Sequence, residues 1–364
     1  MARAATRIEE ERPPHDALEG VPLPRANPVL VGHHAAERAL LDAYRSGRMH
    51  HGWIFAGERG IGRATLAFRL ARFVFAHPDP QSPEGAAADD LSVPAGHPAA
   101  IRLAAGTHPD FLHLQREWIE GDKRFKSQLN VDSVRRIIPF LGTTAGEGGW
   151  RVVIVDPADD MNRSAANAIL KNLEEPPRKT LFLLIARSRG ALLPTILSRC
   201  RTLDLAPLSA EETARVMATV APDVAEGGAG GLARLLAGGS PRRLIELERG
   251  GGAELYRLML AAIEAGDRQA QLGLAARASD QASLQRIMDL FQDYLTHRVR
   301  SLPVPAAESS RGDVPLVTWA MLWEKAALRG QEVEEYNLDR RQFVLDLLEG
   351  SALAINGPGV PKSV

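Results

Sequence analysis

A glycine-rich turn between an apolar run and an amphipathic run has the spacing of a phosphate-binding loop. Its glycines are Gly57, Gly60 and Gly62 in the run GERGIGRATLA, which follows the apolar run WIFA. In such loops backbone N–H groups surround phosphates, a lysine contacts the terminal phosphates, and the next hydroxyl binds Mg²⁺. The residues at these last two positions therefore decide whether the loop can support hydrolysis.

Both of these positions are changed in this loop. The lysine position holds Arg63 and the hydroxyl position holds Ala64, and a hydroxyl comes only one residue later, at Thr65. A guanidinium keeps the charge but not the compact geometry of an ammonium group, so metal-assisted hydrolysis is not expected. The loop is therefore either a vestigial structural turn or a weak nucleotide site.

The end of the apolar run RVVIV is the second place where the residues required for hydrolysis should be found. A hydrolytic site carries a glutamate after the terminal aspartate, and here Asp156 is followed by Pro157, which has no side-chain base. Asp156 alone is a weak candidate for a metal ligand. Asp159 and Asp160 come next, and acids at this position predict a cap for the following helix.

The run SRC places an arginine directly before a strand-like run. Arg199 lies between Ser198 and Cys200 and precedes RTLDL. Taken by themselves, these residues predict a surface ion pair for Arg199 and a core position for Cys200.

The elements around these residues predict a parallel sheet. Five apolar runs have the length of buried strands, namely GWIFAG, FLHL, RVVIVD, TLFLLIA and RTLDL. Helical runs separate them, among them ATLAFRLARFVFA, NVDSVRRIIPFL and RSAANAILKNLEE. Such alternation predicts an α/β domain whose sheet is covered on both faces. The alanine- and proline-rich run 81–106 shows no periodicity and receives no secondary structure.

The character of the sequence changes along the chain. We predict a flexible N-terminal tail, the α/β domain, a small helical domain, a C-terminal helical domain and a closing tail, with the bounds 1–27, 28–206, 207–250, 251–352 and 353–364. A length of 364 residues agrees with two or three domains.

Bulk composition excludes several classes of protein. No apolar run reaches the ~20 residues that span a bilayer, and the N-terminus lacks a secretory pattern, so a cytoplasmic location is expected. A net charge of -1 argues against a protein that grips nucleic acid by itself. The single cysteine, Cys200, excludes a multi-cysteine zinc site, so no zinc is expected.

Two runs together resemble a known family. NAILKNLEEPP and LLPTILSRCRTLDL, which follow each other at the spacing expected for one helix and one strand, are similar to the AAA+ clamp-loader subunits of bacterial DNA polymerase III. The resemblance extends from about residue 28 onward. It implies that Arg199 acts as an arginine finger in trans, and that Arg242 in GGSPRRLIEL stands at a second phosphate-sensing position. A solvated arginine at a helix N-terminus is the alternative for Arg242.

The departures from this family's active pattern distinguish among its subunits. Because Arg63, Ala64 and Pro157 replace the lysine, hydroxyl and glutamate, the sequence resembles the delta prime type, a stator that leaves hydrolysis to its neighbours. The resemblance implies a P-loop NTPase-like (AAA+) domain, a helical lid and an all-α collar that oligomerises. It also implies motor subunits (tau/gamma) that bind ATP and Mg²⁺, a delta subunit, the sliding clamp and primed DNA as partners.

Two rival interpretations remain open. The chain could be a catalytically active clamp-loader or other AAA+ ATPase, which turnover by the isolated chain would favour. It could instead be a nucleic-acid-binding module on a dead NTPase fold, as the basic runs GDKRFK and RSR suggest. Steep salt-dependent DNA affinity of the isolated chain would favour this second rival.

Overall fold

The chain folds into two units that differ in secondary structure. The computed structural model describes residues 14–121, 123–146, 149–227, 230–299, 314–335 and 338–356. The first unit comprises Met1–Pro222 together with Gly239–Arg242, and the second comprises Asp223–Gly238 and Arg243–Val364. The domain bounds drawn from composition stay predictions.

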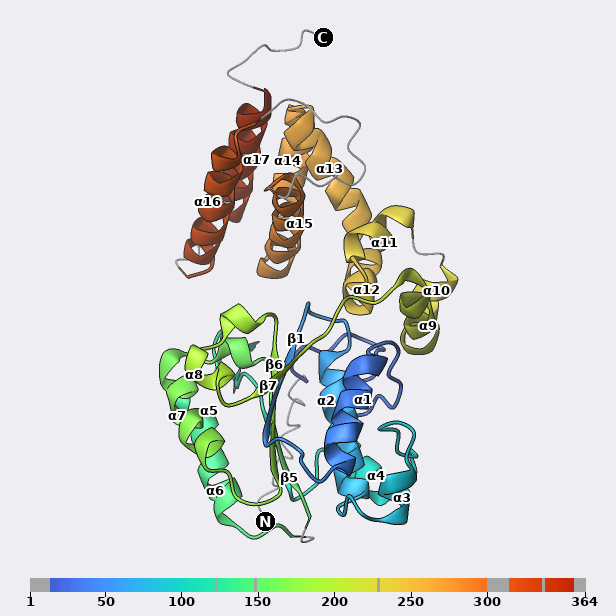
Figure 1. Ribbon diagram of the computed structural model, residues 1–364. Coiled ribbons are helices and arrows are strands. Elements are labelled where there is room, and N and C mark those ends of the chain that lie inside the picture. Colours follow the sequence, from blue (N-terminus) through green and yellow to red (C-terminus); the bar gives the residue numbers. More distant parts are fainter. Residues whose placement is uncertain are drawn as a thin grey trace, which may run out of the picture. The chain divides into compact units, whose positions relative to one another are not determined.

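A five-stranded parallel sheet forms the centre of the first unit (Figure 1). Its strands are β1 (Gly52–Ala56), β2 (Phe111–Leu114), β5 (Arg151–Val155), β6 (Thr180–Ala186) and β7 (Arg201–Asp204). They lie in the order β2-β5-β6-β1-β7, and every hydrogen-bonded pair is parallel. All five coincide with predicted runs, and the predicted α/β fold with a parallel sheet is confirmed.

Helices cover both faces of the sheet (Figure 1). The helices and turns of this unit are α1 (His34–Arg45), α2 (Arg63–Ala76), α5 (Val131–Arg135), α6 (Ile137–Gly142), η1 (Ala158–Asp160), α7 (Arg163–Glu174), η2 (Arg189–Ala191), α8 (Pro194–Leu197) and α9 (Ala210–Val220). Side chains of β1 alternate between two buried clusters, with Trp53 and Phe55 in one and Ile54 and Ala56 in the other. This two-sided burial explains why the strands read as continuous apolar runs.

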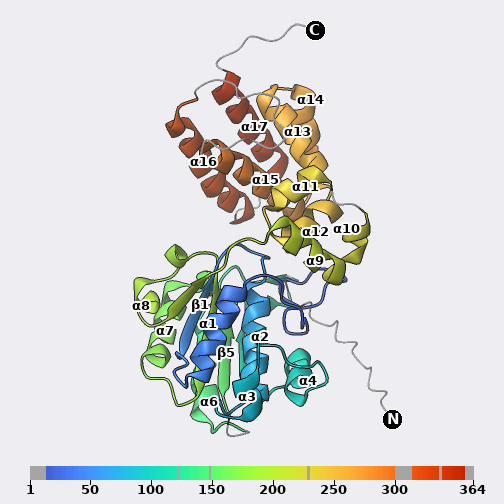
Figure 2. The ribbon, with the colours of Figure 1, turned by 45° about the vertical axis from the view of Figure 1, so that its right-hand side comes forward.

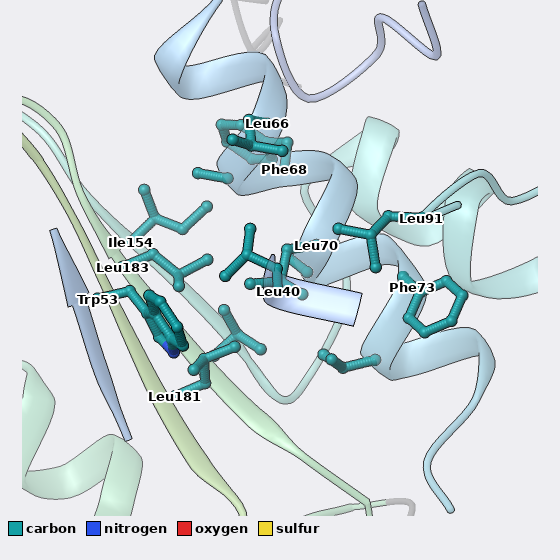
Figure 3. Close-up of a cluster of buried hydrophobic side chains, with 14 of the residues drawn as sticks. Leu40, Trp53, Leu66, Phe68, Leu70, Phe73, Leu91, Ile154, Leu181 and Leu183 are labelled. Atoms are coloured by element: carbon teal, nitrogen blue, oxygen red, sulfur yellow. The ribbon is translucent and has the colours of Figure 1, made fainter. Parts of the chain in front are cut away.

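The cluster on the α1 and α2 side anchors the helix that follows the glycine-rich loop. Figure 3 shows Leu66 and Phe68 of α2 beside strand residues Ile154 and Leu183, and all four are at most 1% exposed. Each buried side chain of this size contributes roughly 1.5 to 3 kcal/mol. The start of α2, and with it the loop, is therefore held firmly against the sheet.

The run 81–106 contains two helices that the sequence analysis did not assign. They are α3 (Pro83–Ala87) and α4 (Pro98–Ala105), and each carries proline in its first turn after a residue whose side chain accepts a capping hydrogen bond, Ser82 or His97. These local signals were present, but the alanine-rich composition obscured them. A short antiparallel hairpin of β3 (Trp118–Ile119) and β4 (Arg124–Phe125) was also not assigned, because two-residue strands have no detectable period.

Residues 14–27 lie against the first unit, although the sequence predicts a flexible tail for 1–27. Arg72, on the buried side of α2, donates through Nη2 to the carbonyl oxygens of Arg25 (3.2 Å) and Asn27 (3.3 Å). Buried guanidinium groups need acceptors, and here the backbone of this segment supplies them. Composition does not reveal such a pairing. The part of the predicted tail before residue 14 lies outside the described residues.

The described part of the second unit is helical (Figure 2). Its helices are α11 (Gly231–Ala237), α13 (Gly252–Glu264), α14 (Arg268–Ala276), α15 (Gln281–Val299), α16 (Leu316–Glu335) and α17 (Arg340–Asn356), while α10 (Pro222–Glu226) and α12 (Pro241–Arg249) begin in the first unit. Helix α13 packs against α14, α15 and α17. Helix α17 extends past the predicted end at residue 352, and the remainder of that predicted tail, from residue 357, lies outside the described residues.

Among the helices of the described ranges, none has the length and apolar character needed to cross a membrane.

Candidate functional site

The glycine-rich loop joins the carboxyl end of β1 to α2. Gly57, Gly60 and Gly62 have φ values of 156°, 83° and 111°. At Gly60 an added Cβ would collide with Arg242 and with the hydroxyl of Ser240, so only glycine fits. Ser240 Oγ also donates to the loop carbonyl of residue 59 at 2.9 Å. The loop is thus closed over by residues that are distant in sequence but belong to the same unit.

Arg63, at the lysine position of the loop, is buried in the first turn of α2 and only 7% exposed. Its Nη1 has no hydrogen-bond partner among the described residues. Burial lowers the pKa of its guanidinium, and the charges of Asp156 and Asp159 act in the opposite direction. A buried guanidinium with a spare donor has the chemistry to accept an anion. Ala64 and Thr65 lie half-buried beside it.

Asp156 is half-buried just after the carboxyl end of β5. Burial raises the pKa of its carboxyl group to about 7; Arg63 opposes the rise, and the carboxylates of Asp16, Asp159 and Asp160 add to it. The aspartate of a hydrolytic site is therefore present at the strand end, whereas the base that should follow it is missing.

The prediction that Asp159 and Asp160 cap the following helix is wrong. Asn162 caps α7 instead, through its side-chain oxygen and a backbone N–H at 2.9 Å. Asp159 accepts a hydrogen bond from Nε of Arg187 at 2.7 Å, and Asp160 pairs with Arg116. The two carboxylates are nearly buried, and arginines from other segments compensate their charge.

An acid from the N-terminal segment meets two arginines at the loop. Asp16 Oδ1 lies 3.0 Å from Nη2 of Arg242 and also pairs with Nη2 of Arg59, and the carbonyl oxygen of Asp16 accepts from Nη1 of Arg242 at 2.6 Å. Burial tends to raise the pKa of Asp16, but the hydrogen bond and charge of Arg59, with the charge of Arg242, hold it below the usual value. The sequence analysis identified Arg242 but not Asp16, because no local pattern marks it.

Arg199 lies just after α8, beside an open pocket. Its Nη1 donates to Thr195 O at 2.8 Å and to Ser198 Oγ at 3.1 Å, and its Nη2 donates to Glu174 Oε1 at 2.6 Å. One third of the side chain (33%) is exposed. The pocket has a volume of about 450 Å³ and is lined by His50, His51, Leu173, Glu174, Ser198 and Arg199.

Cys200 packs inward next to the start of β1. An added Cβ at Gly52 would lie 2.8 Å from the Sγ of Cys200 and 3.3 Å from the carbonyl oxygen of Arg199. Burial raises the pKa of the thiol to about 12, so the thiol is protonated at neutral pH and is a poor nucleophile. Because its side chain packs against Gly52, Cys200 anchors the backbone next to Arg199.

The structure separates the predicted site residues into two groups. The loop group lies at the carboxyl ends of β1 and β5 and contains Gly57, Gly60, Gly62, Arg63, Thr65, Asp156 and Arg242. The finger group precedes β7 and lies beside the start of β1; it contains Ser198, Arg199 and Cys200. The five residues of β1, roughly 16 Å of strand, separate the two groups. Arg199 therefore cannot reach the loop of its own chain.

The basic runs that suggested nucleic-acid binding are largely paired within the chain. Lys126 Nζ lies 2.6 Å from Glu117, and Arg189 pairs with Asp204. Arg187 pairs with a carboxylate of η1, as described above. Cations that are already neutralised by the fold contribute less to phosphate binding.

Comparisons with known proteins point in one direction. The family model described as "DNA polymerase III, delta subunit" matches residues 32–209. The DNA polymerase III subunit delta' of Escherichia coli K12 is 31% identical over 330 residues, which are 85% of this chain and 91% of that protein. The tau subunit of the same organism is 27% identical over 184 residues, 50% of this chain and 26% of tau. A crystal structure of a gamma subunit-related protein from Thermotoga maritima is 17% identical, covers 86% of this chain and 98% of its own, and has a TM-score of 0.44.

Proposed function

The chain belongs to the family of DNA polymerase III delta' subunits, and from this premise we propose that it is the stator of a clamp loader, the assembly that uses ATP to place a sliding clamp on primed DNA. In this role it supports ATP hydrolysis by neighbouring subunits and performs none itself. We also propose a cytoplasmic location, as expected from the sequence.

The position of Arg199 carries this proposal. Its guanidinium lies next to an open pocket, at the end of the sheet opposite to its own loop. A nucleotide that Arg199 contacts must therefore be bound by another chain. Guanidinium groups supplied in this way stabilise the charge that develops on the transferring phosphoryl group. Arg199 is thus the arginine finger of our proposal, with Ser198 and Thr195 holding its side chain and Cys200 anchoring its backbone.

The residues at the loop end of the sheet also support the proposal, because groups that hydrolysis requires are missing there. Arg63 and Ala64 replace the lysine and the hydroxyl, and Pro157 replaces the base. ATP and Mg²⁺ therefore belong to the neighbouring subunits. Weak binding of a nucleotide at the loop needs none of the missing groups and is part of the proposal. No zinc is included, because one cysteine cannot form a multi-cysteine site.

The partners follow from the family. We assign the ATP bound next to Arg199 to a tau or gamma motor subunit, and we include a delta subunit in the assembly, with the clamp and primed DNA contacted by the complex. The C-terminal helices would form the oligomerising collar. Helix α16 supports this part, since it exposes large apolar side chains at Leu316, Val317, Met321, Trp323 and Leu328.

The decisive experiment replaces Arg199 in the assembled complex. The chain is combined with motor and delta subunits, and the clamp- and DNA-stimulated ATPase is compared for the wild type, Arg199→Ala and Arg199→Lys. Loss of the finger should reduce turnover at the site it serves on the order of 10³-fold, and lysine should not restore it. Arg189→Ala, an exposed arginine paired with Asp204, is the matched control and should change turnover little.

The isolated chain is assayed in parallel. Turnover by the chain alone would favour the self-sufficient ATPase, and normal turnover of the complex with Arg199→Ala would remove the finger role. Assembly of each variant is checked by size-exclusion chromatography, so that failed assembly is not mistaken for lost catalysis.

A further inference from the structure

A carboxylate already occupies the outer part of the glycine-rich loop. Asp16 meets Arg59, a loop residue, and Arg242, at the start of α12, through the hydrogen bonds described above. Side chains of both arginines converge on one carboxylate oxygen, Oδ1. Arginines that converge on one oxygen anion form the arrangement that proteins also use for phosphate oxygens.

The residues that bind the carboxylate of Asp16 come from segments that are distant in sequence. Asp16 is separated from Arg59 by 43 residues and from Arg242 by 226 residues. The hydrogen bond from Ser240 to the carbonyl of Arg59 and the close approach of Gly60 to Arg242 fix the two arginines relative to the loop. The fold therefore holds the site for the carboxylate independently of the segment that carries Asp16.

The inner part of the same loop keeps an unsatisfied donor. Arg63 is only 7% exposed, and its Nη1 has no hydrogen-bond partner among the described residues. Arg59 lies within electrostatic range of Arg63, as do the acids Asp156 and Asp159. A buried donor without a partner costs free energy, and an anion in the loop would satisfy it. The loop thus has the chemistry to hold more than one anionic group.

Several contacts hold the N-terminal segment at this place. The ring of His15 packs edge-on against Phe125 of the short hairpin, with ring centroids 4.8 Å apart. Further along the segment, Arg72 binds the backbone carbonyls of residues 25 and 27. Asp16 itself has a left-handed φ of 58°, a conformation that aspartate tolerates better than most residues but that still needs support from neighbouring contacts.

We propose that the carboxylate of Asp16 is an internal anion that occupies the phosphate end of the loop and competes with polyphosphate ligands, the chemical class that includes the tail of a nucleoside triphosphate, so that they bind only weakly. An incoming polyphosphate must displace Asp16 from Arg59 and Arg242 before it can reach Arg63. The inference concerns this chain's own loop, so it does not depend on the role of Arg199.

The test measures binding of inorganic tripolyphosphate to the full chain by isothermal titration calorimetry. Asp16→Asn removes the competing charge and should bind at least about tenfold more tightly than the wild type, since charge-assisted hydrogen bonds to both arginines become available. Asp16→Glu keeps the charge and should stay near the wild type. Asp132→Asn, an exposed acid on α5 that pairs with Arg135, is the matched control.

A double variant locates the binding. Adding Arg242→Ala to Asp16→Asn should abolish the gain in affinity for tripolyphosphate, because the ligand then loses one of the two arginines that bind it. The proposal is overturned if Asp16→Asn binds no better than the wild type, whether both bind or neither does. It is also overturned if the gain persists in the double variant, because the ligand would then be bound elsewhere.

A second measurement on the wild-type chain avoids any question of folding. Hydrogen exchange of the backbone amides of residues 15–20 is followed with and without millimolar tripolyphosphate. Displacement of Asp16 predicts faster exchange in this segment and slower exchange in the loop. Slower exchange in the loop with an unchanged segment would show that a polyphosphate enters without displacing Asp16, and would reject the proposal.

Discussion

The glycine-rich loop and the Arg199 pocket lie at opposite ends of one sheet and use their charges in opposite ways. At the loop, Arg59 and Arg242 pair with Asp16 of the same unit. At the other end, Arg199 pairs with Glu174 beside an open pocket of about 450 Å³. At the loop end the side chain of Arg242 is turned inward, whereas the other end leaves the guanidinium of Arg199 within reach of another molecule.

Exposure makes the second arrangement reversible. The side chains of Arg199 and Glu174 are 33% and 49% exposed, and exposed pairs contribute only ~0 to 1 kcal/mol. Arg199 can therefore leave Glu174 at little cost when a partner's phosphate is offered. Arg242 is less exposed, at 18%, and is held by both the carboxylate and the carbonyl oxygen of Asp16.

The largest expected effect concerns the packing of the loop. Gly60→Ala should destabilise the first unit by roughly 2 to 4 kcal/mol, because alanine at a φ of 83° costs about 1 kcal/mol and its Cβ collides with Arg242 and Ser240. Urea denaturation measures the change. Gly190→Ala, in the turn η2 that follows β6, is the control and should cost little, since the nearest atom, Ser188 Oγ, is 4.0 Å away. Equal effects at both glycines would contradict the tight closure of the loop.

The next effect is a dependence of stability on pH that arises at the loop end. The pKa of Asp156 is raised from 3.8 to about 7, so the folded chain binds more protons than the unfolded chain in this window, and stability falls as the pH rises through it. Asp156→Asn removes the titration. Between pH 5 and pH 8 the wild type should lose about 2 kcal/mol relative to this variant, as measured by denaturation at each pH. Parallel pH profiles would falsify the assignment of this titration to Asp156.

The smallest effect is expected at the finger end. Glu174→Gln removes the charge that pairs with Arg199 and should change the free energy of unfolding by less than about 0.5 kcal/mol, because the pair is exposed. Turnover of the assembled complex should stay within about twofold of the wild type, since glutamine can still accept the hydrogen bond. A loss of stability above about 1.5 kcal/mol would show that Arg199 is a structural residue and would remove the contrast between the two ends.

Much of the first unit could be predicted because its signals are local. Each strand of the sheet is a continuous apolar run, and burial on both faces produces such a run directly. The short helices of 81–106 were not predicted because their capping residues stand in an alanine- and proline-rich run that has no helical periodicity. The cap of α7 was assigned to the wrong residues because Asp159, Asp160 and Asn162 have similar capping propensities, and only the fold decides which of them meets the helix.

The sequence by itself determined what the loop lacks and what the finger run contains, because both are matters of residue identity at fixed local positions: Arg63 and Ala64 in the first case, Arg199 in the second. Only the tertiary structure decided where the charges go. Asp16 and Arg242 are 226 residues apart and meet because the chain folds back on its own loop. An ion pair depends on distance in space, for which separation along the chain carries no information.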